Sequence, residues 1–384
     1  MRARVIVVLT GEPHPGGDVT GRWSYALLKG LAAKNYRVRC LACSSRPEWA
    51  RAAADAVTPL GIDLTCHGYA HERMSIERKW RTVRAPFSYM LSDDLRRTLD
   101  AEVRNGYDVL QLEQLWAGHL ANGHPRTVTS VHHLELLDLE GVWYASPRFI
   151  ASKALLYATE RRLLSRLRTF RATTNRVAQR IAQINGSAAV RTIPVVIDPD
   201  AFSFNAADRP TPSPTIGFVA NMAWSPGYLA AVRLITSIFP MVRARIPDAR
   251  LLIVGWNART ALSQYLGSPG IEIHQNVPDP RPYFEQLGVF TYPLPRGSGT
   301  MIKVLEAMAY GIPVVTTSEG AEGIDVEHGV HARVADDDEA FSESVVELLR
   351  DANARRQMRT AARQLIVERY HRSFDEFAQL YSEI

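Results

Sequence analysis

Short apolar runs alternate with amphipathic stretches through the first half of the chain. The first run is Arg4–Leu9, and after the glycine pair Gly16 and Gly17 an amphipathic stretch covers Trp23–Lys34. Apolar residues recur in that stretch at the spacing of a helix, so the pattern predicts a buried strand, a glycine loop and a helix. Further strands are predicted at Val38–Ala42, Val109–Leu112 and Thr127–Val131. Strands separated by helices form parallel sheets, whose ligands bind at the carboxyl ends of the strands.

The same alternation begins again in the second half of the chain. Residues 206–214 are rich in proline, aspartate, threonine and serine, a composition typical of a linker. A helix is predicted at Tyr228–Ile246, and strands are predicted at Thr215–Val219, Arg250–Val254, Ile271–His274, Val289–Tyr292 and Ile312–Thr316. The sequence therefore predicts an α/β protein with two Rossmann-like domains, 1–205 and 215–367, that face each other across a cleft. Aromatic residues at helical spacing predict a further helix in 368–384.

The length and composition of the chain agree with two domains. Its 384 residues are 46% hydrophobic and 22% charged, which is typical of globular proteins, and they are too many for one ordinary core. The chain has no run of about 18 apolar residues, the length that a membrane-spanning helix needs. The N-terminal apolar run covers only about six residues, so we interpret it as a buried strand and not as a signal peptide. With three cysteines, these features indicate a cytoplasmic protein without disulfides.

Basic residues are concentrated in the first half of the chain. The net charge is +9 over residues 1–205 and −4 over residues 206–384. The densest segment, 146–191, sets a single acid, Glu160, against ten basic residues: Arg148, Lys153, Arg161, Arg162, Arg166, Arg168, Arg171, Arg176, Arg180 and Arg191. Apolar residues at roughly helical spacing around Ala151–Phe170 predict a helix that turns its arginines outward.

This segment suits an anionic partner, either a membrane surface or a phosphorylated acceptor. The alternative is a solvated helix face whose arginines pair with acids elsewhere in the same domain. Because no nucleic-acid-binding motif is present, nucleic acid is not expected as a partner.

A glycine-rich turn in the second half is a candidate anion site. The strand that ends at Tyr292 leads into Gly297-Ser298-Gly299, and a helix is predicted to begin there with Ser298 or Thr300 as its N-cap and to end at Gly311. Free backbone N–H groups at Gly299–Met301 and the helix dipole favour an anion, and a pyrophosphate fits such a site.

Two charged residues share one face of the same predicted helix. Lys303 lies near the anion site and adds a cation, whereas Glu306 lies one turn deeper, where its carboxylate is able to accept hydrogen bonds from both hydroxyls of a ribose. The alternative is a simple salt bridge between Lys303 and Glu306 on a surface helix.

The stretch from Gly297 to Lys303 with Val304–Val315, VLEAMAYGIPVV, resembles the donor-site motif of retaining glycosyltransferases of family 4, in particular a subgroup of bacterial sugar transferases. The resemblance implies the GT-B fold, with the C-terminal helix crossing back to the N-terminal domain. It also implies a metal-independent, cofactor-free hexosyltransferase that moves a sugar with retention from a UDP-, GDP- or TDP-sugar. The acceptor hydroxyl would belong to a glycan, a lipid-linked sugar or a small molecule.

Weaker similarity extends over nearly the whole chain and assigns further residues. Gly16 and Gly17 resemble the N-terminal glycine loop of the family. His132 resembles a histidine that contacts the donor sugar. The resemblance therefore makes His132 and Lys303 the candidate catalytic residues. The polar residues His133 and Glu135 that follow are predicted to contact the acceptor.

The chain departs from the family motif at two places. Ser298 stands where the family has the first glutamate of its pair, and Asn221 and Pro226 stand where it has an arginine and a lysine for the diphosphate. Lys303, with Arg296 as second choice, is therefore predicted to supply the missing positive charge. These departures leave two other functions open: a non-catalytic GT-B protein that binds a nucleotide sugar or a partner enzyme, and an enzyme similar to the nucleotide-sugar 2-epimerases.

Overall fold

The computed structural model describes residues 2–17, 19–44, 47–69, 87–140, 147–204 and 214–384. The chain divides into two compact units, which we call unit 1 (Met1–Val196 with Arg372–Ile384) and unit 2 (Ile197–His371). The predicted linker at 206–214 lies outside the described residues except for Pro214, and the predicted domain limits stay predictions.

Unit 1 is built on a seven-stranded parallel sheet with the order β3-β2-β1-β4-β5-β6-β7. Its strands are β1 (Arg4–Leu9), β2 (Arg37–Ser44), β3 (Asp63–Gly68), β4 (Val109–Glu113), β5 (Thr127–Val131), β6 (Thr169–Ala172) and β7 (Ala189–Thr192). The interior strand β1 is buried on both faces, with Val5 to Leu9 at 0% exposure. This explains why the first apolar run is continuous and does not alternate with polar residues.

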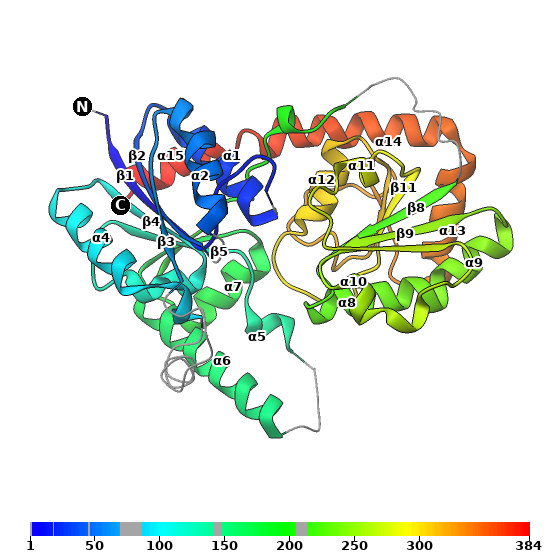
Figure 1. Cartoon of the computed structure of the whole chain (residues 1–384), viewed down its shortest axis with the longest axis horizontal. Helices are drawn as coiled ribbons and strands as arrows, with labels where there is room; N and C mark the ends of the chain where they lie inside the picture. The colour runs from blue at the N-terminus through cyan, green and yellow to red at the C-terminus, as the bar shows by residue number, and fades with distance from the viewer. Residues whose placement is uncertain (1, 18, 45–46, 70–86, 141–146, 205–213) are drawn as a thin grey trace. The chain divides into compact units, whose positions relative to one another are not determined.

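Helices cover this sheet (Figure 1). The helices of unit 1 within the described residues are α1 (Val19–Ala33), α2 (Pro47–Val57), α4 (Asp93–Arg104), α5 (Glu135–Asp138), α6 (Pro147–Arg166), α7 (Asn175–Ile184) and α15 (Ser373–Ser382). Two of them begin at a capping side chain: Ser92 accepts a hydrogen bond from Leu95 N before α4, and Thr174 accepts one from Val177 N before α7.

Unit 2 is built on a six-stranded parallel sheet with the order β10-β9-β8-β11-β12-β13. Its strands are β8 (Thr215–Val219), β9 (Arg250–Gly255), β10 (Ile271–Gln275), β11 (Val289–Tyr292), β12 (Val314–Thr316) and β13 (Arg333–Val334). Its helices are α8 (Ser225–Arg233), α9 (Phe239–Arg245), α10 (Ala258–Ala261), α11 (Arg281–Phe284), α12 (Ile302–Ala309), α13 (Asp338–Arg350) and α14 (Ala352–Leu365). The prediction of two Rossmann-like α/β sheets is confirmed.

Irregular helical turns complete both units. Short 3₁₀ helices lie at Thr58–Leu60, Ser88–Met90, Leu115–Leu120, Pro199–Ala201 and Ser263–Tyr265. Segments of π-helix lie at Leu234–Ile238, between α8 and α9, and at Ile366–Tyr370, after α14. Together α8, the first π segment and α9 form one helical run, Ser225–Arg245, whose length and mean apolarity would suffice to cross a membrane. Half of its most apolar part is buried within unit 2, as in a core helix of a globular domain.

The helix predicted around Ala151–Phe170 ends earlier than its apolar pattern indicates. Helix α6 ends at Arg166, and Phe170 lies on the short strand β6. Leu163 and Leu167 are both buried, and Phe170 continues their spacing, so periodicity alone does not mark where the helix stops. Strands β3, β6 and β7 were not expected from the sequence.

The C-terminal helix α15 belongs to unit 1, as the predicted crossover requires. A Cβ atom on Gly30 of α1 would lie 1.9 Å from the ring of Phe374, so glycine lets the two helices pack in close contact. Tyr381 Oη donates a hydrogen bond to Gln111 Oε1 on β4 at 3.2 Å, and the ring of Phe377 lies under the Arg171 guanidinium of β6 at 5.0 Å. Helix α15 is therefore part of the core of unit 1.

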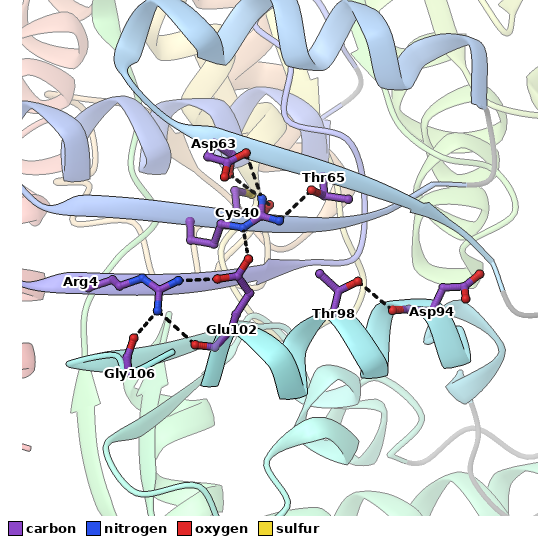
Figure 2. A network of polar contacts seen from close by, with 9 residues as sticks. Arg4, Cys40, Asp63, Thr65, Asp94, Thr98, Glu102 and Gly106 are labelled. Carbon is purple, nitrogen blue, oxygen red and sulfur yellow. Dashed lines mark hydrogen bonds and ion pairs between the residues drawn. The ribbon is translucent and has the colours of Figure 1, made fainter. Parts of the chain in front are cut away.

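One carboxylate on α4 links strands β1 and β2 (Figure 2). Arg39 Nε donates to Glu102 Oε1 at 2.7 Å, and Arg4 Nη2 donates to Glu102 Oε2. The same Arg39 guanidinium donates to Asp63 O at 3.0 Å and to Thr65 Oγ1 at 2.8 Å on β3. Burial raises the pKa of Glu102, but the hydrogen bonds and charges of the two arginines outweigh burial and hold the pKa below its ordinary value of 4.5.

We expect Glu102→Gln to destabilise the protein by about 2 kcal/mol at neutral pH, because two charge-assisted hydrogen bonds lose the negative charge. Since the folded-state pKa is lowered, this stabilisation is complete above 4.5 and is lost as the pH falls below that value. The midpoints of thermal unfolding of the parent protein and of Glu102→Gln should therefore differ at pH 7 and converge at acid pH. Glu383→Gln, in an exposed ion pair with Arg191, is the control and should leave unfolding unchanged. Equal unfolding of Glu102→Gln and the parent at pH 7 would contradict the role of Glu102.

Candidate functional site

The glycine-rich turn of unit 2 lies at the carboxyl edge of its sheet. Strand β11 ends at Tyr292, and residues 293–301 lead from it into α12. Gly299 has a φ of +83°, a left-handed conformation that side chains rarely adopt, and Ser298 beside it is 2% exposed. The turn thus places the predicted anion site at the edge where ligands of parallel sheets bind.

The start of α12 corrects one prediction. The helix begins at Ile302, with Met301 at the N-cap position and no side-chain cap, whereas Ser298 or Thr300 was expected to cap it. The left-handed Gly299 separates Ser298 from the helix, and Met301 with a ψ of 87° is not yet helical. The other end agrees with the prediction, since Gly311 follows the helix with a φ of +66°.

Lys303 and Glu306 contact each other on α12. The Nζ atom of Lys303 lies 2.8 Å from Oε2 of Glu306, so the salt bridge of the simpler interpretation exists. It does not lie on the surface, however, because the side chains are only 16% and 3% exposed. A carboxylate this deeply buried requires hydrogen bonds and a counter-charge, and Lys303 supplies both.

Turns after β8 and β9 complete this edge of unit 2. Asn221 Oδ1 accepts a hydrogen bond from Ala223 N at 2.9 Å, so its side chain shapes the turn after β8. A Cβ atom on Gly255, the last residue of β9, would lie 1.8 Å from Ala220 O, which shows how closely the two turns approach. Trp256 follows with 60% of its surface exposed, and sequence analysis did not single it out.

The glycine loop of unit 1 lies between β1 and α1. Gly16 N donates to the ring nitrogen Nδ1 of His14 at 3.0 Å, and Gly17 N donates to His14 O at 3.1 Å. A Cβ atom on Gly17 would lie 3.2 Å from the same carbonyl oxygen, a tight contact. The two hydrogen bonds to His14 therefore stabilise the loop, and the glycines allow its close backbone contacts.

His132 directly follows β5 at the carboxyl edge of the sheet of unit 1. Its Nε2 atom lies 2.9 Å from Glu113 Oε2, and its ring packs against Trp23 of α1 with centroids 4.4 Å apart. Burial lowers the pKa of His132, the positive charge of Arg171 lowers it further, and Glu113 opposes both without outweighing them. The lowered pKa favours the neutral imidazole over the imidazolium.

Glu113, the last residue of β4, is a buried carboxylate that sequence analysis missed. Gln111 Nε2 donates to its Oε1 at 2.7 Å, Ser130 Oγ donates to the same oxygen at 2.9 Å, and Arg171 Nη1 lies 3.9 Å from Oε2. Burial raises the pKa of Glu113, but His132, Arg171 and Ser130 outweigh burial and lower it, so the carboxylate is ionised. The signal in the sequence was the pair of polar residues, Gln111 and Glu113, inside an otherwise apolar strand.

Arg171 corrects the interpretation of the basic segment. It was counted among the ten basic residues of segment 146–191 that suit an anionic partner, but it is 1% exposed and lies on β6. Its Nε atom donates to Ile193 O at 2.8 Å and its Nη2 atom to Pro194 O at 2.6 Å. Glu160, the one acid of that segment, is also buried and not at the surface.

His133 and Glu135, the predicted acceptor residues, lie beside other carboxylates. His133 Nε2 is 3.9 Å from Glu135 Oε1; desolvation lowers the pKa of His133, but Glu135, Asp138 and Glu160 outweigh it and raise the pKa to about 9. Glu160 accepts hydrogen bonds from Glu135 N and Leu136 N, both at 2.8 Å, at the start of α5. Burial raises the pKa of Glu160 to about 7, despite those two hydrogen bonds.

Two family models match this chain. The model described as Glycosyltransferase Family 4 matches residues 20–201, and the model described as Glycosyl transferases group 1 matches residues 213–351. Together they span most of both units. The chain belongs to the family 4 glycosyltransferases. The family resemblance stated from the sequence is confirmed, and the bacterial subgroup stays a prediction.

Solved structures share the fold of this glycosyltransferase over nearly its whole length. Sucrose-phosphate synthase from Thermosynechococcus elongatus aligns with a TM-score of 0.73 and 16% identity, covering 99% of this chain and 98% of that one. HepE from Anabaena, solved in complex with UDP-glucose, aligns with a TM-score of 0.67 and 14% identity, covering 99% and 100%. A TarM variant from S. aureus, solved with fondaparinux, α-GlcNAc-glycerol and UDP, aligns with a TM-score of 0.67 and 9% identity, covering 99% of each chain. These matches confirm the GT-B fold.

A curated relative is described as an uncharacterized 44.6 kDa protein in the cps region of Klebsiella pneumoniae. It is 26% identical to the glycosyltransferase over 176 residues, which are 43% of this chain and 45% of the relative. The match therefore spans less than half the length of either protein.

The predicted site residues of the glycosyltransferase fall into two groups. The carboxyl edge of the sheet of unit 2 carries Asn221, Arg296, Ser298, Gly299, Thr300, Met301, Lys303 and Glu306. The carboxyl edge of the sheet of unit 1 carries Gly16, Gly17, His132, His133 and Glu135. Within the described ranges, no group of three or more His, Cys, Asp or Glu side chains is placed to hold a metal ion.

Proposed function

We propose that this glycosyltransferase moves a sugar, with retention of configuration, from a nucleotide-sugar donor to the hydroxyl of a glycan, a lipid-linked sugar or a small molecule. The observation that carries the proposal is the buried pair of Lys303 and Glu306 directly after the turn at Gly299, at the carboxyl edge of the sheet of unit 2. Structures with the same fold hold UDP-glucose in HepE and UDP with α-GlcNAc-glycerol in the TarM variant.

In this proposal unit 2 binds the nucleotide. Backbone N–H groups between Gly299 and Met301 and the ammonium group of Lys303 bind the diphosphate, because both offer hydrogen-bond donors to negative oxygens. Glu306, one turn along α12, accepts hydrogen bonds from the ribose hydroxyls. Arg296, from the same turn, supplies further positive charge.

Retention follows from attack on the face that the diphosphate leaves. Such a reaction depends on positioning and on stabilising the leaving charge, and it needs neither a strong protein base nor a metal ion when side-chain cations stabilise the diphosphate. A neutral His132 agrees with a role in binding and not in acid catalysis.

One observation favours a second candidate, a GT-B protein that binds a nucleotide sugar without turnover. Ser298 is uncharged and buried where the family motif has a glutamate. Incubation with UDP-, GDP- and TDP-sugars, followed by mass spectrometry, distinguishes the candidates. Transfer or donor hydrolysis supports the enzyme, binding without product supports the second candidate, and an altered donor sugar without acceptor supports a 2-epimerase-like reaction.

We also propose that the protein is cytoplasmic and binds the anionic inner face of the membrane through α6 and the residues directly after it. Arg161, Arg162, Arg166 and Arg168 are exposed, and no carboxylate of the described ranges pairs with them. Other basic residues of the segment do find acids, since Arg180 lies 3.6 Å from Glu140 and Arg171 is buried beside Glu113. Ile150 near the start of α6 is 56% exposed, which adds an apolar contact for a lipid surface.

Glu306→Ala should weaken nucleotide binding by a few kcal/mol, about 2–3, because two buried hydrogen bonds to the ribose would be lost. Isothermal titration with the preferred nucleoside diphosphate measures the loss. Glu343→Ala on α13, whose side chain is 60% exposed, removes the same group far from the turn and should bind normally. Unchanged affinity in folded Glu306→Ala would refute the ribose contact.

Lys303→Gln should weaken binding of the nucleoside diphosphate by at least about tenfold and leave the affinity for the nucleoside nearly unchanged. The physical reason is that the ammonium group is assigned to the diphosphate alone. Titrations with both ligands give the comparison. An equal loss for both ligands would mean that Lys303 acts only through its salt bridge with Glu306.

The protein should co-sediment with vesicles that contain anionic lipid at low salt and be released at high salt. Each arginine near an anionic surface contributes about 1 kcal/mol, so four arginines account for measurable binding. Replacing Arg161, Arg162, Arg166 and Arg168 together by Gln should abolish it. The control variant has four other exposed arginines of unit 1 replaced by Gln, namely Arg37, Arg51, Arg97 and Arg104. Its net charge equals that of the first variant. If wild-type protein stays in the supernatant at low salt, the membrane proposal is wrong and a phosphorylated acceptor remains.

A further inference from the structure

The buried charge of Glu113 sets the chemistry of its neighbours. The side chain is 1% exposed, and an ionised carboxylate at that depth is stable only when donors surround it. Gln111, Ser130 and His132 direct hydrogen-bonding atoms at its two oxygens within 2.9 Å. Arg171 adds the compensating positive charge at 3.9 Å.

An ionised carboxylate only accepts hydrogen bonds, so His132 must donate to it. The atom in contact is Nε2, at 2.9 Å from Glu113 Oε2. A neutral imidazole carries one proton, and placing it on Nε2 leaves the other ring nitrogen, Nδ1, as an acceptor. The contact with Glu113 therefore selects one of the two tautomers of His132.

The ring of His132 is held by Trp23 on one face and by Glu113 at Nε2, and Nδ1 is left for a ligand. Trp23 packs on the ring at an angle of 45°, and Thr173 Oγ1 donates to the backbone carbonyl oxygen of His132 at 2.9 Å. Among the described residues, none forms a hydrogen bond with Nδ1. Nδ1 is also absent from the fully buried polar atoms that lack a partner, so it is open to a ligand. An acceptor nitrogen of fixed direction thus reaches the carboxyl edge of the sheet.

We propose that Glu113 is a positioning residue that fixes the Nε2–H tautomer of His132, so that Nδ1 accepts a hydrogen bond from a sugar hydroxyl. The chemistry recognised is a hydroxyl donor, which either the donor sugar or the acceptor sugar provides. This inference rests on the proposed function for its substrate and extends it to a residue outside the predicted site. Glu113 itself does not contact the sugar.

The tautomer is measured first, in the wild-type protein and without substrate. The chain contains 11 histidines, and in ¹⁵N-histidine-labelled protein the signals of His132 are those that disappear in His132→Gln. We expect an Nε2 shift typical of a protonated nitrogen and an Nδ1 shift typical of an unprotonated one. The reverse pattern, or a cationic ring at pH 7, would overturn the proposal. This measurement does not depend on activity, so it stands even if no sugar transfer is found.

Glu113→Gln then tests the positioning. A glutamine presents an accepting oxygen or a donating NH₂ group to His132, so we expect both tautomers and a kcat that is about 10- to 100-fold lower. Nucleotide affinity should be unchanged. Tyr381→Phe is the control: it removes a hydrogen bond to Gln111 in the same network and should lower thermal stability without altering the tautomer or kcat.

Donor hydrolysis without acceptor identifies the source of the hydroxyl. If Nδ1 contacts the donor sugar, Glu113→Gln slows both hydrolysis and transfer. If Nδ1 contacts the acceptor, only transfer slows. Either result supports the positioning role, whereas normal rates of both reactions in a folded Glu113→Gln protein would refute it. Failure of the proposed function would be a different result, namely no hydrolysis or transfer by the wild-type protein with any nucleotide sugar.

Discussion

The ion pair between Glu113 and Arg171 is the interaction on which the interior of unit 1 depends. It joins the end of β4 to β6, and both side chains are 1% exposed. Removing one partner from such a pair costs about 3–5 kcal/mol, whereas replacing the whole pair by apolar residues is often neutral. Stability alone therefore does not require these charges. At the carboxyl edge of the sheet, the charges hold His132 in one orientation and one tautomer. Apolar residues would not do this.

The same pair explains why the last helix of the chain belongs to unit 1. Arg171 uses two donors on the carbonyl oxygens of Ile193 and Pro194, and its flat face lies on the ring of Phe377. Tyr381 closes the network from the same helix through Gln111. A buried guanidinium needs this much contact to offset its desolvation, and burial does lower the pKa of Arg171. Helix α15 thus contributes to the environment of Glu113 although it lies at the other end of the sequence.

The sequence predicted the strands that are buried apolar runs and missed those whose pattern is ambiguous. Arg4–Leu9, Thr127–Val131, Thr215–Val219 and Val289–Tyr292 agree residue for residue with β1, β5, β8 and β11. Strand β6 has only four residues, and its phenylalanine continues the helical spacing of α6, so local periodicity favoured the wrong element. Tertiary contacts decide such short segments, and a single sequence does not contain them.

The candidate site was predictable where chemistry is local and not where it depends on pairing between strands. Lys303 and Glu306 are three residues apart, and helical geometry alone brings them together. Glu113 and His132 are brought together by the register of β4 and β5, in which Glu113 pairs with Ser130. Sequence analysis fixed neither that register nor the burial of Arg171, so the network of Glu113 remained hidden.

The sum of charges at the turn before α12 relates the two places where the chain departs from the family motif. Serine at 298 removes a carboxylate from the turn, and Asn221 and Pro226 stand where two cations are otherwise found. Lys303 and Glu306 neutralise each other, so a glutamate at 298 would have cancelled the charge of Arg296 and left no net positive charge for an anion. With serine the turn keeps its backbone donors and the charge of Arg296. Loss of the carboxylate thus offsets part of the loss of the cations, and the two departures are consistent with one anion site that works with fewer charges of either sign.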